Sequence, residues 1–189
     1  MIDEYLFNIL VKGKKQTSYK FYIFKAILKF ISLGKFDVSF FELGCMMIAV
    51  SYFDMDIYVN NKTEHDKLLL MKSELITDCN YYGNVNEELI FKDLLDIKNK
   101  DFIKAVKSLV AYAPYLILSY GQWDAYLEGL ITWQKNKKIE ELSNRFSDDV
   151  LYSIKDKNLH LNKIFVKELE KDLNYYNDEI DKYIRNYFN

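Results

Sequence analysis

Few side chains in this sequence have the types and spacing that catalysis or metal binding requires. His65 and His160 are the only histidines, and neither has a cysteine or carboxylate at ligand spacing beside a second histidine. Structural zinc sites combine four such ligands in short, paired spacings. A Ser-His-Asp or Cys-His arrangement stays open, but no nucleophile-elbow motif supports one. We therefore expect no catalytic residue, no metal and no cofactor.

Two short acidic motifs are similar to active-site motifs but stand in the wrong context. Asp54-Met55-Asp56 follows an apolar run, as the aspartate pairs of phosphotransferases do, but that run opens like a helix rather than a buried strand. The segment 168–171, Glu-Leu-Glu-Lys, is similar to the acid-and-lysine motifs of nucleases, but it lies on a predicted helix where its charges face solvent. The six glycines are scattered, so no phosphate-binding loop is present. An enzyme with an unrecognised carboxylate site is the third hypothesis for function.

The clearest local signal is an acid-free, lysine-rich segment near the N-terminus. Residues 5–36 contain seven lysines and no Asp or Glu. On the helix predicted over 17–33, one polar stripe has a 4-3-4-3 spacing and consists of Ser18, Tyr22, Lys25, Lys29 and Ser32. Lysines that follow phosphates, with aromatic rings that stack on bases, are typical of nucleic-acid binding. The predicted DNA- or RNA-binding residues are Lys12, Lys14, Lys15, Tyr19, Lys20, Tyr22, Lys25 and Lys29.

The alternative interpretation of this segment is a solvated helix face beside a lysine-rich hinge. The chain as a whole has 26 Lys and Arg against 28 Asp and Glu, for a net charge of −2. Proteins that bind nucleic acid over their whole surface usually carry more positive charge. Any polyanion would therefore have to approach the lysine-rich side, which orients the encounter.

Length and composition indicate one soluble domain spanning residues 1–189. The chain has 189 residues, 50% of them hydrophobic and 29% charged, which suffices for a core. The apolar runs at 40–53 and 109–118 are too short or interrupted to span a bilayer, so no membrane partner is expected. Cys45 and Cys79 are predicted to be buried free thiols, which favours the cytoplasm. The abundance of Lys, Asn, Ile, Tyr and Phe indicates an AT-rich genome of a bacterium or phage.

The spacing of apolar and capping residues predicts a mainly α, multi-helix fold. Ser39 and Glu42 form a capping box before an apolar helix at 40–53. The helical spacing of apolar residues ends before 150–161. Two short apolar runs in this segment flank a polar turn, which predicts one small β-hairpin. The other predicted helices are 1–11, 17–33, 63–80, 87–97, 102–112, 122–134 and 162–188. On 122–134, Trp123, Tyr126, Leu127, Leu130 and Trp133 are expected to share one side.

Several of these segments together resemble the N-terminal helical region of bacterial HNH endonuclease domain proteins. Ser18-Tyr19-Lys20-Phe21-Tyr22 resembles the "N-S-Y-K-F-Y" opening of that family, and Ala113-Pro114-Tyr115-Leu116-Ile117-Leu118 resembles its "V-P-Y-R-F-L" segment. The next helix of that family resembles residues 39–53 of this chain. The similar segments are Ser39-Phe40-Phe41-Glu42, Met46-Met47-Ile48-Ala49 and Tyr52-Phe53. His65-Asp66-Lys67-Leu68 resembles the "Q-D-x-L" helix start of that family. Thr17 and Leu116 depart from the family's asparagine and arginine.

The resemblance covers nearly all of the chain, yet the His-Asn-His metal nuclease segment is missing. It therefore implies a non-catalytic recognition module of a bacterial or phage defence-related nuclease system, and no catalytic residue carries over. The leading hypothesis is nucleic-acid binding through the lysines named above. The alternative is a protein–protein interaction module: a nuclease subunit, inhibitor or immunity-type partner that docks through Trp123, Trp133 or the Tyr-rich terminal helix.

Overall fold

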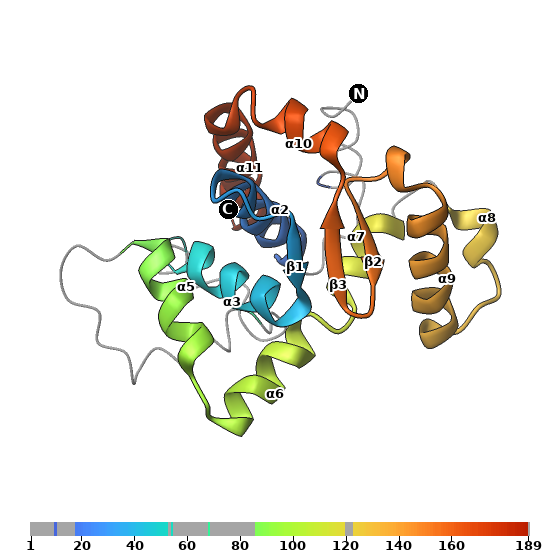
Figure 1. Cartoon of the computed structure of the whole chain (residues 1–189), viewed down its shortest axis with the longest axis horizontal. Helices are drawn as coiled ribbons and strands as arrows, with labels where there is room; N and C mark the ends of the chain where they lie inside the picture. Colours follow the sequence, from blue (N-terminus) through green and yellow to red (C-terminus); the bar gives the residue numbers. More distant parts are fainter. Residues whose placement is uncertain are drawn as a thin grey trace.

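The computed structural model describes residue 10 and residues 18–52, 54, 68, 86–119 and 123–188. The fold is mainly α-helical with a small antiparallel sheet, as the sequence predicts (Figure 1). Except for Leu10 and Leu68, the predicted helices at 1–11 and 63–80 lie outside the described residues. The same is true of Cys79, His65, Lys12, Lys14 and Lys15.

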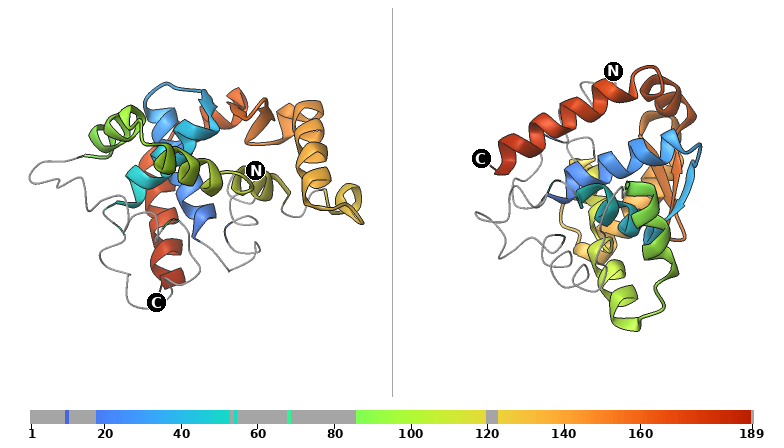
Figure 2. Two further views of the ribbon diagram at one scale, coloured as in Figure 1. Left: turned by 90° about the horizontal axis from the view of Figure 1, so that it is seen from below. Right: turned by 90° about the vertical axis from the view of Figure 1, so that its left-hand side faces the viewer.

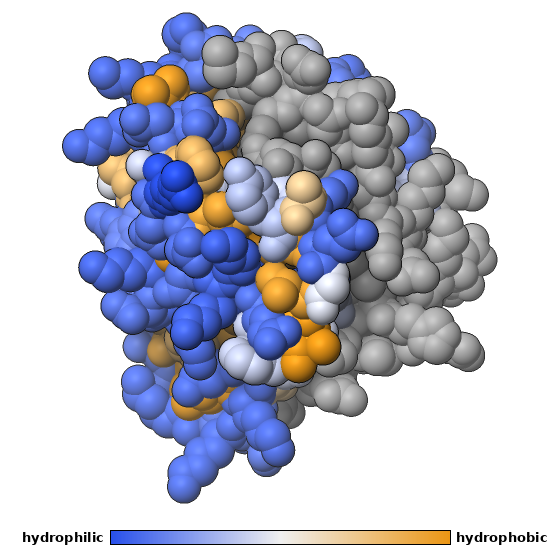
Figure 3. All heavy atoms as spheres, turned by 90° about the vertical axis from the view of Figure 1, so that its right-hand side faces the viewer, coloured by the Kyte–Doolittle hydropathy of each residue, from blue (hydrophilic) through white to orange (hydrophobic). Residues whose placement is uncertain are grey.

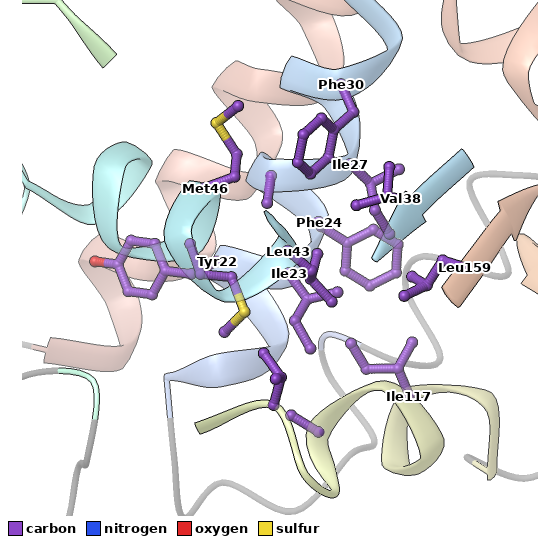
Figure 4. Close-up of a cluster of buried hydrophobic side chains, with 14 of the residues drawn as sticks. Tyr22, Ile23, Phe24, Ile27, Phe30, Val38, Leu43, Met46, Ile117 and Leu159 are labelled. Atoms are coloured by element: carbon purple, nitrogen blue, oxygen red, sulfur yellow. The ribbon is translucent and has the colours of Figure 1, made fainter. Parts of the chain in front are cut away.

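The core is built around helix α2 (Tyr19–Ser32), which is buried on almost every side. It packs against α3 (Phe40–Ser51), α7 (Ala113–Ser119) and α11 (Leu173–Phe188). Figure 4 shows Phe24, Ile27 and Phe30 from α2 meeting side chains from α3, α7 and the sheet. The helix ends where the sequence predicts, because Gly34 takes the left-handed conformation with φ of +67°.

Helix α3 begins at the predicted capping box. The Ser39 side chain accepts a hydrogen bond from Glu42 N, and the Glu42 carboxylate accepts one from Ser39 N. Cys45 on this helix is a buried free thiol, as expected, and burial raises its pKa to about 12. Gly44 allows close approach of α6 (Lys100–Leu109), because a Cβ at this position would lie 2.6 Å from Val106 Cγ1.

The sheet has three strands in the order β1-β3-β2. The predicted hairpin is confirmed as β2 (Tyr152–Lys155) and β3 (Asn158–Leu161). Its two-residue turn has φ of +49° at Asp156 and +59° at Lys157, which suits the right-handed strand twist. The sequence did not reveal β1 (Asp37–Ser39), which pairs antiparallel with the far side of β3.

The remaining described helices flank this centre, with α5 and α6 on one side and α8 and α9 on the other (Figures 1 and 2). Their bounds are α5 (Glu87–Asp96), α8 (Asp124–Leu127) and α9 (Thr132–Arg145), with the 3-10 turn η4 (Ser147–Asp149) after α9. The prediction of one helix over 122–134 is wrong. Gly129, with φ of +74°, separates α8 from α9, and Trp123 and Trp133 therefore do not share a face.

The predicted terminal helix is two helices, α10 (Lys163–Leu169) and α11. Asp172 causes the new start, because its carboxylate accepts a hydrogen bond from Tyr175 N and so acts as a helix cap. Apolar residues at helical spacing form one stripe along both helices, and it faces inward across the break. Phe165, Leu169, Tyr176, Ile180 and Ile184 are buried, and Leu173 and Tyr187 are half-buried. Figure 2 shows α11 lying along α2, so the stripe covers the central helix.

One helical stretch, Lys100–Ser119, is long and apolar enough to meet the length and hydropathy criteria for a membrane span. Half of it is buried inside the fold, and it contains the turn at 110–112 between α6 and α7. These properties are typical of core helices.

Candidate functional site

Most of the polar stripe of α2 does not face solvent, contrary to the sequence-based expectation: Lys29 is half-buried, and Ser32 at the end of the helix is the exposed member. Ser18 and Tyr22 are 0% exposed and Lys25 is 9% exposed. The stripe is covered because α11 and α5 lie over this side of α2. The burial of Tyr22 leaves no room for its ring to stack on a base, and Tyr19 is half-buried.

Lys25 lies between two carboxylates from distant parts of the chain. Its Nζ is 2.8 Å from Asp54 Oδ2 and 3.0 Å from Asp181 Oδ1 of α11. Burial alone would lower the pKa of Lys25, but the charges and hydrogen bonds of the two aspartates outweigh burial and raise it above 10.5. Lys25 is therefore held as a cation, which suits an ion pair and not a nucleophile or a general base.

Lys29 is engaged in the same way by the first turn of α5. Its Nζ is 3.0 Å from Glu88 Oε1 and 3.6 Å from Glu87 Oε2. The hydrogen bond from Lys29, followed by its charge, lowers the pKa of Glu88 below its ordinary value. The two lysines thus meet four carboxylates, so this network has a net charge of −2.

The two ion-pair groups border an open cavity of about 390 Å³ between α2, α3, α5 and α11. Its lining is mixed: Lys25, Leu28, Lys29, Ser32, Val50, Glu87, Leu173, Asn174, Asn177 and Asp181. The charged residues that line the cavity are two lysines and two acids, and the same network includes two more carboxylates. The described residues therefore provide no excess positive charge for a phosphate. The two lysines of the cavity join α11 and α5 to the central helix through these ion pairs.

Two other lysines of the acid-free segment also have partners within the protein. Lys20 is 5% exposed, and its Nζ donates a hydrogen bond to the Leu10 carbonyl at 2.5 Å. Lys35 pairs with Glu42. The structure therefore brings the described lysines of this segment into ion pairs and hydrogen bonds rather than onto one free surface.

A serine, a histidine and an aspartate lie in one row across the sheet. The strand register places Asp37 and Ser153 on either side of His160, and His160 Nδ1 is 2.6 Å from Asp37 Oδ1. Ser153 is 8% exposed, and the described residues show no hydrogen bond between it and His160. The row therefore supplies an Asp–His pair that joins β1 to the hairpin, without the activated serine that acyl transfer requires.

The acidic motifs occupy the contexts that the sequence indicates. Asp54 serves as a partner of Lys25, while Met55 and Asp56 lie outside the described residues. Glu168 and Lys171 form an exposed pair at 2.5 Å. Within the described part of the chain, no group of three or more His, Cys, Asp or Glu side chains is placed to hold a metal ion.

Three large hydrophobic side chains that are close together in the sequence are exposed on α8, the following turn and the start of α9. Tyr126, Ile131 and Trp133 are 54%, 59% and 62% exposed; we call these three residues the 126–133 patch. Trp123 is 5% exposed and belongs to the core, so the prediction of an exposed pair of tryptophans holds for Trp133 alone. Figure 3 views the side of the molecule that carries α8 and α9, and in its coloured part a few orange and pale side chains lie among blue ones.

No protein-family model, curated protein or solved structure matches this chain. The relation to the helical region of HNH endonuclease domain proteins therefore remains a proposal that rests on the short motifs alone.

Proposed function

We propose that this chain is a helical recognition module that binds a protein partner through the 126–133 patch. The observation that carries this proposal is the exposure of Trp133, which presents 62% of its surface to solvent at the first turn of α9. Tryptophan is largely buried in most folds, and leaving it in water forgoes a large hydrophobic gain. A second protein surface would recover that gain.

The composition of the patch matches that of the centre of a protein interface. Tryptophan and tyrosine are enriched among the few residues that carry most of the binding energy in such interfaces. Exposed charges of both signs flank the patch along the chain: Asp124, Glu128, Lys135 and Lys137. An apolar centre within a polar rim is the usual anatomy of a reversible interface.

The other hypothesis, nucleic-acid binding through the N-terminal segment, now depends on Lys12, Lys14 and Lys15. Lys20, Lys25, Lys29 and Lys35 already have partners within the protein, and the network of Lys25 and Lys29 is net negative. The geometry therefore favours the protein-partner class. A nuclease subunit, inhibitor or immunity-type partner remains the proposed identity of that protein, on the resemblance described above.

The test compares Trp133→Ala with Ile164→Ala, because Ile164 is 61% exposed but lies on α10. A partner recovered by crosslinking in the native host is purified, and its affinity for each variant is measured by calorimetry. Trp133→Ala should weaken binding at least 30-fold, which corresponds to about 2 kcal/mol, the size expected of a central residue. Ile164→Ala should change affinity less than threefold. Equal affinity of Trp133→Ala and the wild type would contradict the proposal.

A further inference from the structure

We infer that the solvent face of α6 is a binding site for the phosphodiester backbone of nucleic acid. This site is separate from the N-terminal lysines and from the 126–133 patch. It comprises Lys100, Lys104 and Lys107, which we call the α6 stripe.

The fold places these three lysines on one face. Phe102, Val106 and Leu109 of α6 are buried, and α6 packs on α3. The three lysines have the spacing i, i+4 and i+7, point away from that core and are all exposed. At 1.5 Å per residue, the stripe runs for about 10 Å along the helix. Lys98, also exposed, lies just before the helix and extends the same positive region.

The lysines of the α6 stripe belong to the described lysines that have no acidic partner, and these three share one face of a single helix. Lys25, Lys29, Lys35, Lys138, Lys171 and Lys182 each form an ion pair. Lys100, Lys104 and Lys107 form none within the described structure. Asp101, the one acidic residue of α6, lies in the first turn, where the helix dipole stabilises it. The positive charge of the stripe therefore remains available to a ligand.

A phosphate backbone fits this arrangement better than a single anion does. Each strand of a duplex carries one negative charge for about every 3.4 Å of its axis, so a 10 Å track of lysines faces about three phosphates. Lysine binds phosphate as a point charge and needs no fixed orientation. Because the protein is net negative, a polyanion is attracted to this side and repelled by the acidic remainder.

An exposed aromatic residue also lies close to the stripe in the sequence. Tyr112 follows α6 and is 55% exposed. Aromatic rings beside a basic track stack on the bases of single strands. If the Tyr112 ring stacks on bases, the protein should bind single strands more tightly than duplexes, and the binding measurement below compares the two.

The test is fluorescence anisotropy with labelled single- and double-stranded DNA and RNA of random sequence. The triple variant Lys100→Gln, Lys104→Gln, Lys107→Gln is compared with the control Lys155→Gln, Lys163→Gln, Lys167→Gln. Both variants remove three exposed lysines that have no ion pair in the described structure, so they have the same net charge. Thermal unfolding of both variants checks that each is folded.

Three phosphate contacts predict a slope of about −2.7 for the logarithm of affinity against the logarithm of salt concentration, or about 40-fold between 50 and 200 mM salt. The α6 variant should lose at least tenfold in affinity at about 50 mM salt and most of that slope. The control variant should bind within threefold of the wild type. Stronger binding of single strands, reduced by Tyr112→Ala, would assign the ring to base stacking.

Three outcomes would overturn the inference. The first is that the wild type binds no nucleic acid at low salt. The second is that the two triple variants lose equal nucleic-acid affinity. The third is that the wild type binds anionic phospholipid vesicles but not nucleic acid. Trp133→Ala serves as a second control, because the 126–133 patch lies on α8 and α9 and its loss should leave nucleic-acid affinity unchanged.

Discussion

Lys25 illustrates how one buried charge organises three parts of this protein. It joins α2 to Asp54 after α3 and to Asp181 on α11, and its side chain is only 10% exposed. Removing the lysine would leave two carboxylates close together without a counter-charge. Lys29 makes comparable contacts, but its side chain is 23% exposed and its partners are 32% and 42% exposed, so water can replace it more easily.

We therefore expect Lys25→Met to lower the free energy of unfolding by about 1–3 kcal/mol, the cost of leaving partly buried polar groups unpaired. Lys29→Met, the matched control, should cost less than about 1 kcal/mol. Both are measured by urea denaturation near neutral pH. Equal losses in the two variants would show that the burial of Lys25 gives it no special role.

Glu42 provides the pH dependence of the capping box. Burial would raise the pKa of Glu42, but hydrogen bonds from Lys35 and Ser39 outweigh burial and lower the pKa below 4.5. A carboxyl whose pKa is lower in the folded state adds stability above its unfolded-state pKa. That contribution is lost as the pH falls through the folded-state pKa.

Glu42→Gln keeps a residue that can complete the capping box but removes the charge. The wild type should exceed this variant in free energy of unfolding by about 1 kcal/mol near neutral pH. The difference should shrink below the ordinary pKa of 4.5 and vanish at lower pH. Denaturation curves across this range measure it, and Glu141→Gln, at an exposed pair, should change stability by less than about 0.5 kcal/mol. A difference independent of pH would contradict this account.

At the scale of elements, the contact between α3 and α6 depends on a glycine, Gly44, which has no side chain to keep the helices apart. A Cβ on residue 44 would lie 2.6 Å from Val106 Cγ1 and 3.2 Å from Val110 Cγ1. Val106 is fully buried, and a β-branched side chain has little rotamer freedom in a helix. Gly44 therefore sets how closely α6, and with it the α6 stripe, lies against the core.

Gly44→Ala should lower the free energy of unfolding by about 1–3 kcal/mol through overpacking, despite the higher helix propensity of alanine. Val106→Ala removes the clashing methyl groups, so the double variant should be more stable than the sum of the single changes predicts. A double-mutant cycle measured by thermal and chemical denaturation gives this coupling energy. Zero coupling, or a more stable Gly44→Ala, would show that the two helices are not in tight contact.

The elements that the sequence predicts well are those with local signals. The capping box at Ser39 and the hairpin at 150–161 depend on residues within a few positions of one another. The break at 170–172 was missed because the apolar spacing continues from α10 into α11 without a glycine or proline. Strand β1 was missed because three residues carry little pattern, and its partner is far away in the chain.

The same distinction explains the candidate sites. The spacing of Lys25 and Lys29 on α2 is a local property, but their partners Asp54, Asp181, Glu87 and Glu88 come from three other segments. Only the folded chain shows that these charges are neutralised. The exposure of Trp133 likewise follows from the turn at Gly129, which the apolar spacing of 122–134 conceals.

At the scale of the whole molecule, the two proposed surfaces lie on different sides. Figure 1 shows α6 below α3 at the lower edge and α8 and α9 at the right. A protein partner and a nucleic acid would therefore have separate places to bind. The central layer of α2, α11 and the sheet connects these sides, and α2 contributes more of the buried hydrophobic side chains than any other described helix.

The pairing of β1 with β3 also limits how early the chain can complete its fold during synthesis. Asp37 and His160 meet although they are 123 positions apart, and α2 is covered by α11 at the far end of the sequence. On the ribosome, the apolar faces of α2 and α3 emerge long before their last partners have been translated. Exposed apolar helices and an unpaired strand edge favour aggregation of an incomplete chain. The buried faces of α2 and α3 can therefore be fully covered only after the hairpin and α11 have left the exit tunnel.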